Sequence, residues 1–396
     1  MDRRQIIALF TCGLVPWTIA NGLIPLLPLY ALDLGATQTS AGFYLAFSYA
    51  MMLLGTLLAG WLSDRVQRRR EMLILSGAIA VPFVWLMGRA PDIAALALYS
   101  AVFFALAGAG TSLVNILAGI FSEKGQRGAV FGVLVLTASI GSITGGFLSG
   151  PLVDNWGYPT MFSVLSLTCI LWPLTALFVQ DRDAKEKRQT EDLITENGSK
   201  RSPGYYFILA ASLAAGIALF IALLARSLVM DGLGYTAAAI TGIGGIASLL
   251  TLPLPPLIGR YSDRMDREPF LVGGYLVGIL GLAALGWLTS FSGFLFASVA
   301  VTVMISLNAA LGAALVTDLV PPGSLGRAMS AFNSTIWVGG ILGYALTGFL
   351  IDNLGLGSAI FLGCTLLLAA IGVVILLRKV KVTRHETNRV SQRISK

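Results

Sequence analysis

The sequence contains the stretch Gly60-Trp61-Leu62-Ser63-Asp64-Arg65 and, 199 residues later, a similar stretch, Gly259-Arg260-Tyr261-Ser262-Asp263-Arg264. Each stretch ends a long apolar run and is followed by further charged residues before the next apolar run. The return of this pattern at a fixed distance indicates that the second half of the chain repeats the first. The fold is therefore expected to consist of two similar units.

The composition predicts that both units lie in a membrane. The chain has 396 residues, of which 56% are hydrophobic and 12% charged, and its mean hydropathy is +0.80. Soluble domains average about 45–50% apolar and about 25% charged residues, so a water-soluble enzyme of this size is excluded. Twelve membrane crossings of about 20–25 residues would need about 240–300 residues, which leaves only short loops.

The apolar runs between charged or Gly/Pro-marked breaks predict twelve transmembrane helices in an all-α fold. The predicted helices cover residues 5–30, 39–62, 72–88, 93–121, 129–152, 160–179, 204–228, 236–258, 270–290, 293–320, 328–351 and 358–377. The first run is too long for a signal-peptide core and is interpreted as a retained span. The domains expected are an N-terminal six-helix bundle (1–179), a cytoplasmic linker (180–203), a C-terminal six-helix bundle (204–379) and a cytoplasmic tail (380–396).

The repeat continues within these runs. Arg127 is matched by Arg327 at an offset of 200, and residues 154–157 (Asp-Asn-Trp-Gly) by residues 352–355 (Asp-Asn-Leu-Gly) at an offset of 198. At the same offset of 198, three glycines of the fifth run match three of the eleventh: Gly141, Gly145 and Gly150 match Gly339, Gly343 and Gly348. Six spans in each half give repeats of parallel topology, related by an axis along the membrane normal.

The basic residues set the expected orientation. With both termini on one side of a cell membrane, 25 of the 27 Lys and Arg residues fall on that side and only Arg89 and Arg226 on the other. Because basic loops stay in the cytoplasm, a multi-pass protein of the cell inner membrane with both termini cytoplasmic is predicted. A nucleic-acid partner is not expected, because the basic residues lie in the predicted cytoplasmic loops and tail, where they set the orientation of a membrane protein.

Residues for intramembrane catalysis are missing from the sequence. Cys12, Cys169 and Cys364 each stand alone in an apolar run, and the one histidine, His385, lies in the tail. These residues suggest neither a disulfide framework nor a metal site, and no cofactor is expected. Nothing resembles the G-x-x-x-x-G-K-[ST] phosphate loop of an ATPase. The chain is therefore not expected to be an enzyme.

The motif G-x-x-x-D-R-x-x-R-R between the second and third spans resembles the signature loop of the major facilitator superfamily. The twelve spans, the central linker and the degenerate second copy of the motif also resemble that superfamily. The usual Gly before the Arg pair is Gln67 in the first copy and Asp266 in the second. The resemblance implies a cytoplasmic gate in which Asp64 acts as a latch; topology anchoring alone is the other interpretation. The gate candidates are Gly60, Asp64, Arg65, Arg68, Arg127, Gly259, Asp263, Arg264, Arg267 and Arg327.

Within that superfamily, the closest motifs are those of the twelve-span drug:proton antiporters. Gly132, Gly141, Gly145 and Gly150 keep the spacing of their glycine-rich motif, with Gly146 in place of the usual Pro and Ser149 in place of a Gly. Pro25-x-x-Pro28 resembles a second motif, but the span-4 Arg is missing from residues 103–108. The glycines of spans 5 and 11 either seal the interface between the halves or only allow close helix packing.

The substrate path is expected between the halves near the bilayer midplane. The cavity candidates are Asn21, Asn115, Arg226, Asn308, Asn333 and Trp337. Each amide could instead be an interhelical hydrogen-bonding residue, because an amide facing lipid is costly. For Arg226, snorkelling to the membrane surface is the favoured interpretation.

No carboxylate lies in the centre of a predicted span, which weakens proton coupling and argues against a pocket that holds organic cations by charge. A neutral, lipophilic or anionic substrate fits better. The sequence therefore predicts a monomeric secondary transporter in the lipid bilayer that works by alternating access on small molecules. Efflux of lipophilic or drug-like compounds, with protons as one candidate coupling ion, is favoured. The alternative is an importer or facilitator of a sugar, carboxylate or lipid.

Overall fold

The computed structural model describes residues 3–121, 127–181, 203–254, 257, 266–320 and 325–394, and all regular structure in these ranges is helical. The first half contains α1 (Arg3–Leu23), α2 (Leu27–Asp33), α3 (Gln38–Val66), α4 (Arg69–Met87), α5 (Ile93–Phe121), α6 (Arg127–Cys169) and α7 (Leu171–Ala176). The second half contains α9 (Pro203–Gly232), α10 (Ala237–Thr251), α12 (Arg267–Trp287), α13 (Phe291–Leu319), α14 (Leu325–Leu354) and α15 (Leu356–Ile394).

Ten helical stretches in the described residues are long and apolar enough to cross a membrane, so the predicted number of twelve is not confirmed. One difference lies in the stretch 132–176, which is 45 residues long. At about 1.5 Å per residue it is roughly twice as long as one crossing needs. Gly157 has φ 77° and ψ 173° and breaks α6 there. The second difference is α10, whose 15 residues are shorter than a full span.

The helix breaks follow the repeat seen in the sequence. Gly157 matches Gly355, which has φ 80° and separates α14 from α15. Gly35 (φ 86°) and Gly234 (φ 79°) lie 199 residues apart, before α3 and α10. Positive φ is readily adopted only by glycine, which explains these residues at the turns.

The helix starts after the first two turns are also alike. Thr37 caps α3 by accepting a hydrogen bond from the Ser40 N–H, and Thr236 caps α10 by accepting one from the Ala239 N–H. A threonine at this position satisfies one of the N–H groups that a helix start leaves unpaired. The two halves therefore share their turns and caps as well as their sequence pattern.

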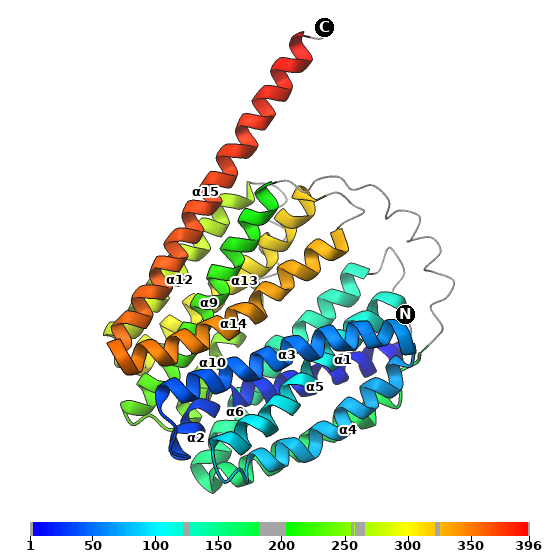
Figure 1. The fold of residues 1–396 in the computed structure, drawn as a ribbon, viewed down its shortest axis with the longest axis vertical. Coiled ribbons are helices and arrows are strands. Elements are labelled where there is room, and N and C mark those ends of the chain that lie inside the picture. The colour runs from blue at the N-terminus through cyan, green and yellow to red at the C-terminus, as the bar shows by residue number, and fades with distance from the viewer. Residues whose placement is uncertain are drawn as a thin grey trace.

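The helices pack in two groups, α1–α7 and α9–α15, called here the first and second helical groups. Within the first group, α3 packs on α5 and α1 packs on α6; within the second, α9 packs on α14 and α15 and α12 packs on α13. The groups meet where α3 contacts α14 and where α6 contacts α10. Figure 1 shows that they converge at one end of the molecule and diverge at the other.

The two ends differ in charge. The end where the groups diverge carries Arg65, Arg69, Arg70, Arg267 and Arg378 and is called the Arg-rich end; the other is called the far end. At the Arg-rich end, α15 continues well beyond the second group (Figure 1). Residues 380–394, expected as a tail, therefore extend the last helix.

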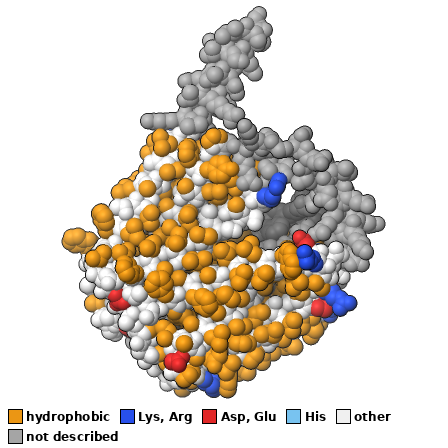
Figure 2. Space-filling model, viewed as in Figure 1, with side chains coloured by type: hydrophobic (Ala, Val, Ile, Leu, Met, Phe, Trp, Pro, Cys, Tyr) orange, Lys and Arg blue, Asp and Glu red, His pale blue; other side chains and the backbone are white. Residues whose placement is uncertain are grey.

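The outer surface is apolar (Figure 2). Large hydrophobic side chains are exposed on many helices; Phe178, Trp287 and Phe361 are 74%, 87% and 70% exposed. A soluble monomer rarely exposes apolar surface on this scale. This is the surface of a multi-pass membrane protein.

Candidate functional site

At the far end, a carboxylate of the first helical group holds the start of a helix of the second. The two oxygens of Asp154, in α6, accept hydrogen bonds from the backbone N–H groups of Ala237 (2.8 Å) and Ala238 (2.9 Å), the first residues of α10. The first N–H groups of a helix have no partner within it, and the helix dipole favours a negative charge there. The Asp154 contact therefore joins α6 to α10 across the two groups.

The matching carboxylate of the second group makes the reciprocal contact. Asp352, in α14, accepts a hydrogen bond of 2.6 Å from the backbone N–H of Thr39, in the first turn of α3. Asp154 and Asp352 are 198 residues apart, the offset of the repeat. Each group thus supplies one carboxylate and one helix start, and the two contacts close the far end.

Two other carboxylates lie at this end. Asp33 and Asp231 end α2 and α9, again 198 residues apart, and are near enough for their charges to interact. Partial burial raises the pKa of the Asp33 carboxyl.

Two of the predicted glycines also lie at the contact between the groups. A Cβ atom on Gly150 would overlap the backbone of Ala237 and Ala238, and one on Gly348 would overlap Gln38 and Gly42. These two positions keep the far end close-packed.

The other predicted glycines pack within their own group. Gly141 and Gly145 lie against the backbone of α1, while Gly339 and Gly343 lie against α9. Among the described residues, none has an atom within 4 Å of the place where a Cβ atom of Gly132 would be.

Five aromatic side chains lie between the groups and are called here the aromatic layer: Trp17, Tyr49, Phe220, Trp337 and Tyr344. Trp17 stacks on Trp337, with ring centroids 6.2 Å apart and an interplanar angle of 22°. Tyr49 contacts Trp337 at 6.2 Å, Tyr344 at 5.3 Å and Phe220 at 4.8 Å. Because Trp17 and Tyr49 come from the first group and the rest from the second, the layer bridges the two groups.

A cavity of about 210 Å³ begins beside this layer and extends toward the Arg-rich end. Its lining includes Gly13 and Trp17 of α1, Asn115 of α5, and Leu134, Thr137 and Ala138 of α6. Figure 2 shows the surface hollowed between the two groups on this side. Among the described residues, the two groups are thus joined at the far end and diverge toward the Arg-rich end.

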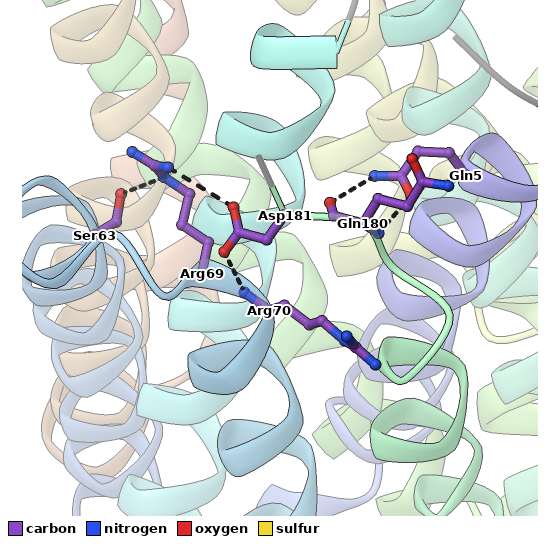
Figure 3. A network of polar contacts seen from close by, with 6 residues as sticks. All are labelled: Gln5, Ser63, Arg69, Arg70, Gln180 and Asp181. Atoms are coloured by element: carbon purple, nitrogen blue, oxygen red, sulfur yellow. Dashed lines mark hydrogen bonds and ion pairs between the residues drawn. The ribbon is translucent and has the colours of Figure 1, made fainter. Parts of the chain in front are cut away.

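The start of α4, with Arg69 and Arg70, is held by hydrogen bonds and an ion pair to Ser63 of α3 and to Asp181, which follows α7 (Figure 3). The Arg69 guanidinium donates to Ser63 Oγ (3.3 Å) and lies 3.9 Å from Asp181, which also accepts from the Arg70 N–H (3.0 Å). Next to it, the Gln5 side chain bonds both the N–H and the carbonyl of Gln180. No pattern in the sequence marks Asp181 as a partner of Arg69 and Arg70, because Asp181 is one of several charged residues that follow the sixth predicted span.

The predicted gate residues are only partly described. Asp64, Arg65 and Arg68 are exposed, Gly60 lies near Ser112, and the Arg65 guanidinium lies 4.2 Å from the centroid of the Trp61 ring. In the second copy, Arg267 forms an ion pair of 2.6 Å with Asp318, and Arg327 is exposed. Gly259, Asp263, Arg264 and the Arg127 side chain lie outside the described residues. The gate role of this set stays a prediction.

The predicted cavity residues lie in different surroundings. Asn115 lines the cavity and Trp337 belongs to the aromatic layer, while Asn333 is exposed. Asn21 donates a weak hydrogen bond (3.4 Å) to the Ala138 carbonyl. Asn308 is buried, and its Oδ1 accepts hydrogen bonds from Ser212 (3.1 Å) and Tyr275 (2.8 Å), so it ties α9, α12 and α13 together.

The expectation that Arg226 snorkels to the surface is wrong. Its side chain is enclosed by the second group: the residue is 4% exposed and donates to Ser298 Oγ at 3.0 Å. Arg226 lies almost two turns before the end of α9, and Ser298 lies about two turns after the start of α13. The two residues are therefore at a similar depth, and the guanidinium bonds within the protein.

Comparison with known proteins decides the family. The sequence model described as Major Facilitator Superfamily matches residues 9–307 and, in a second overlapping match, residues 206–395. The chain belongs to the Major Facilitator Superfamily. The resemblance drawn from residues 60–69 is thereby confirmed, and membership indicates a membrane transporter, which is not a class of enzyme.

Multidrug resistance proteins of enteric bacteria are among the relatives. The chain is 26% identical over 276 residues to "Multidrug resistance protein MdtG" of Citrobacter koseri, covering 65% of this chain and 66% of the relative. It is 25% identical over 273 residues to the protein of the same name of Enterobacter lignolyticus, covering 65% and 64%. The chain thus spans slightly less than two-thirds of these relatives. They support a superfamily member of the drug:proton antiporter type.

Solved structures share the fold. A peptide transporter POT in complex with sulfate superposes with a TM-score of 0.75 at 12% identity, covering 96% of this chain and 94% of that one. The nucleoside transporter NupG superposes with a TM-score of 0.73 at 12% identity, covering 96% and 99%. At this identity the likeness concerns the fold alone.

Proposed function

We propose that this chain is a secondary transporter that exports lipophilic or drug-like compounds by alternating access. Its two helical groups, residues 1–179 and 204–379, would rock about the aromatic layer as two six-helix bundles, joined by a cytoplasmic linker at 180–203. In this proposal the chain crosses the membrane twelve times as a monomer. The break at Gly157 supports counting the stretch 132–176, which includes α7, as two crossings, and α10, with its 15 residues, as a short one.

The observation that carries the proposal is the difference between the two ends. Contacts of Asp154 and Asp352 close the far end, whereas the groups diverge at the Arg-rich end. Basic loops stay on the cytoplasmic side of a membrane, which supports a cytoplasmic Arg-rich end. In this orientation the structure is the inward-open conformation, and the Asp contacts form the outer gate.

The chemistry of the path supports a lipophilic substrate. A ligand that enters from the Arg-rich end meets Trp17 and the apolar wall of the cavity, with Asn115 and Thr137 as polar groups. Sites for small molecules commonly combine apolar and aromatic walls with a few polar groups that fix orientation. The multidrug resistance relatives support the same class of substrate and the efflux direction.

The test is transport into inside-out vesicles containing the protein, across a panel of lipophilic compounds, with and without a proton gradient. Accumulation driven by the gradient is the expected result and supports efflux by proton antiport. Equilibration that ignores the gradient would replace this proposal with a facilitator. Absence of transport for the whole panel, in vesicles that contain correctly inserted protein, would contradict the proposal.

A further inference from the structure

Arg226 is a buried cation that the proposed function has not used. Its guanidinium lies in the far half of the second helical group, where Nη1 donates to Ser298 of α13 and Nη2 lies near Gly244 of α10. Tyr344 of α14 is close enough for its hydroxyl to interact electrostatically with Arg226. Four helices, α9, α10, α13 and α14, thus surround the charge.

The charge is not neutralised by the protein around it. Among the described residues no carboxylate lies within 4.0 Å of the Arg226 guanidinium. Nε of Arg226 is buried without a hydrogen-bond partner in the described part of the chain, whereas the hydroxyl of Tyr344 lies within reach of the Tyr49 hydroxyl. Arginine stays protonated in proteins, and a buried unpaired charge is strongly unfavourable. An anion bound here would neutralise the guanidinium and satisfy Nε.

The position of Tyr344 connects this charge to the transport path. Tyr344 belongs to the aromatic layer and contacts Tyr49 of the first group, with ring centroids 5.3 Å apart. Neither Arg226 nor Tyr344 belongs to the lining of the cavity beside Trp17. In the proposed rocking motion, Tyr49 of the first group would separate from Tyr344 of the second and leave Tyr344 and its neighbour Arg226 open to the path.

We propose that Arg226, Tyr344 and Ser298 form a subsite for the carboxylate of an amphipathic aromatic substrate, whose apolar part stacks on the aromatic layer. The proposal rests on the proposed function for the location of the path. It deepens that function by assigning the substrate class: lipophilic organic acids rather than organic cations. A guanidinium binds a carboxylate through two parallel hydrogen bonds, which gives direction as well as affinity.

Binding of a matched pair of probes to the purified full-length protein tests the subsite, with a naphthoate anion and its neutral methyl ester measured by calorimetry. The native protein should bind the acid at least about 10-fold more tightly than the ester, as expected for one charge-assisted contact. Arg226→Gln should remove this preference and leave the ester affinity unchanged. Arg226→Lys should retain part of the preference, because the charge remains but the paired geometry is lost.

Two controls keep the test decisive. Arg89→Gln removes an exposed arginine of the first group and should leave the preference intact. If Arg226→Gln does not fold, Tyr344→Phe, which removes only the hydroxyl, should lower acid binding by about 3- to 10-fold.

Equal binding of acid and ester by the native protein, or a preference that survives Arg226→Gln, would overturn the subsite. The subsite would also be contradicted if chloride competed with the acid and the protein did not distinguish the acid from the ester. That result would indicate a site for inorganic anions. Binding is measured here without a gradient or vesicles. A preference for the acid without any efflux would therefore support the subsite and contradict only the proposed export.

Discussion

The carboxylate of Asp352 accepts a hydrogen bond of 2.6 Å from the backbone N–H of Thr39, 313 residues earlier in the chain. The equivalent contact, from Asp154 to the N–H groups of Ala237 and Ala238, joins the other pair of helices. Each crosses between the helical groups and involves a helix start, so both must break for the far end to open.

Substituting the two carboxylates should weaken the outer gate. Asn keeps an acceptor oxygen but loses the charge, so Asp154→Asn and Asp352→Asn should each destabilise the closed far end by at most about 1 kcal/mol, since both contacts lie near the surface. Together the two losses amount to at most about 2 kcal/mol, so the double variant should shift the population toward outward-open molecules by up to about 30-fold. Reaction of a cysteine placed at Tyr49 with a membrane-impermeant thiol reagent added from outside measures this shift.

Cysteine reactivity that stays at the native level in the double variant would show that the carboxylates do not hold the gate. Asp92→Asn is the matched control, because Asp92 is an exposed far-end carboxylate that accepts a hydrogen bond from Ala95, at the start of its own helix.

Filling the close contact between the groups should hold the far end open. Gly150→Leu places a side chain where α10 now lies, so the variant should fold but lose at least about 10-fold in transport rate, since the inward-open state is blocked. Gly132→Leu introduces the same side chain where no atom of the described residues lies within 4 Å, and this variant should transport normally. Similar rates for the two variants would contradict a sealing role for Gly150.

Removing a ring of the aromatic layer should weaken substrate binding. Trp17→Ala removes the stack on Trp337 and part of the cavity wall, and the loss of one aromatic contact of about 0.5–1.5 kcal/mol should raise Kd about 2- to 10-fold. Calorimetry with a lipophilic compound that the vesicles accumulate gives Kd directly. Trp287→Ala, on the exposed outer surface, should leave Kd unchanged; an equal effect at both positions would argue against the layer as the site.

The latch role of Asp64 predicts a transport defect without an insertion defect. Asp64→Asn should lower the transport rate at least about 5-fold, because the inner gate would close less firmly, while membrane insertion stays normal. Glu71→Gln changes an exposed carboxylate of the next helix, α4, and serves as the control. A normal transport rate in Asp64→Asn would leave the charges of this loop as topology anchors only.

The repeat offset of 198–200 residues allowed much of the fold to be predicted. It made Asp154 equivalent to Asp352 and Gly150 equivalent to Gly348, and in the structure the members of each pair make matching contacts. Sequence could not give their partners, because the contacts depend on how the groups dock. The matched carboxylates at span ends, conserved in the repeat within this chain, were the signal that could have marked them as functional.

Side-chain fate within a span was harder to predict. Arg226 was expected at the surface because a single arginine near a helix end commonly snorkels. Its actual place depends on Ser298, Gly244 and Tyr344, which come from three other helices and leave no local pattern. Tyr49 and Tyr344 were missed for the same reason, since a tyrosine in an apolar run predicts burial but not which ring it meets.

The central claim is that the two helical groups move as rigid bodies, so that the far end and the Arg-rich end open in turn. Distances between spin labels in the reconstituted protein test this claim most directly. One pair, Asp92 and Leu288, reports on the far end, and the other, Val66 and Phe270, on the Arg-rich end; all four positions are exposed. Adding a transported compound should populate molecules in which the far-end distance is longer and the Arg-rich distance shorter. Two distances that stay fixed, or that lengthen together, would contradict the account.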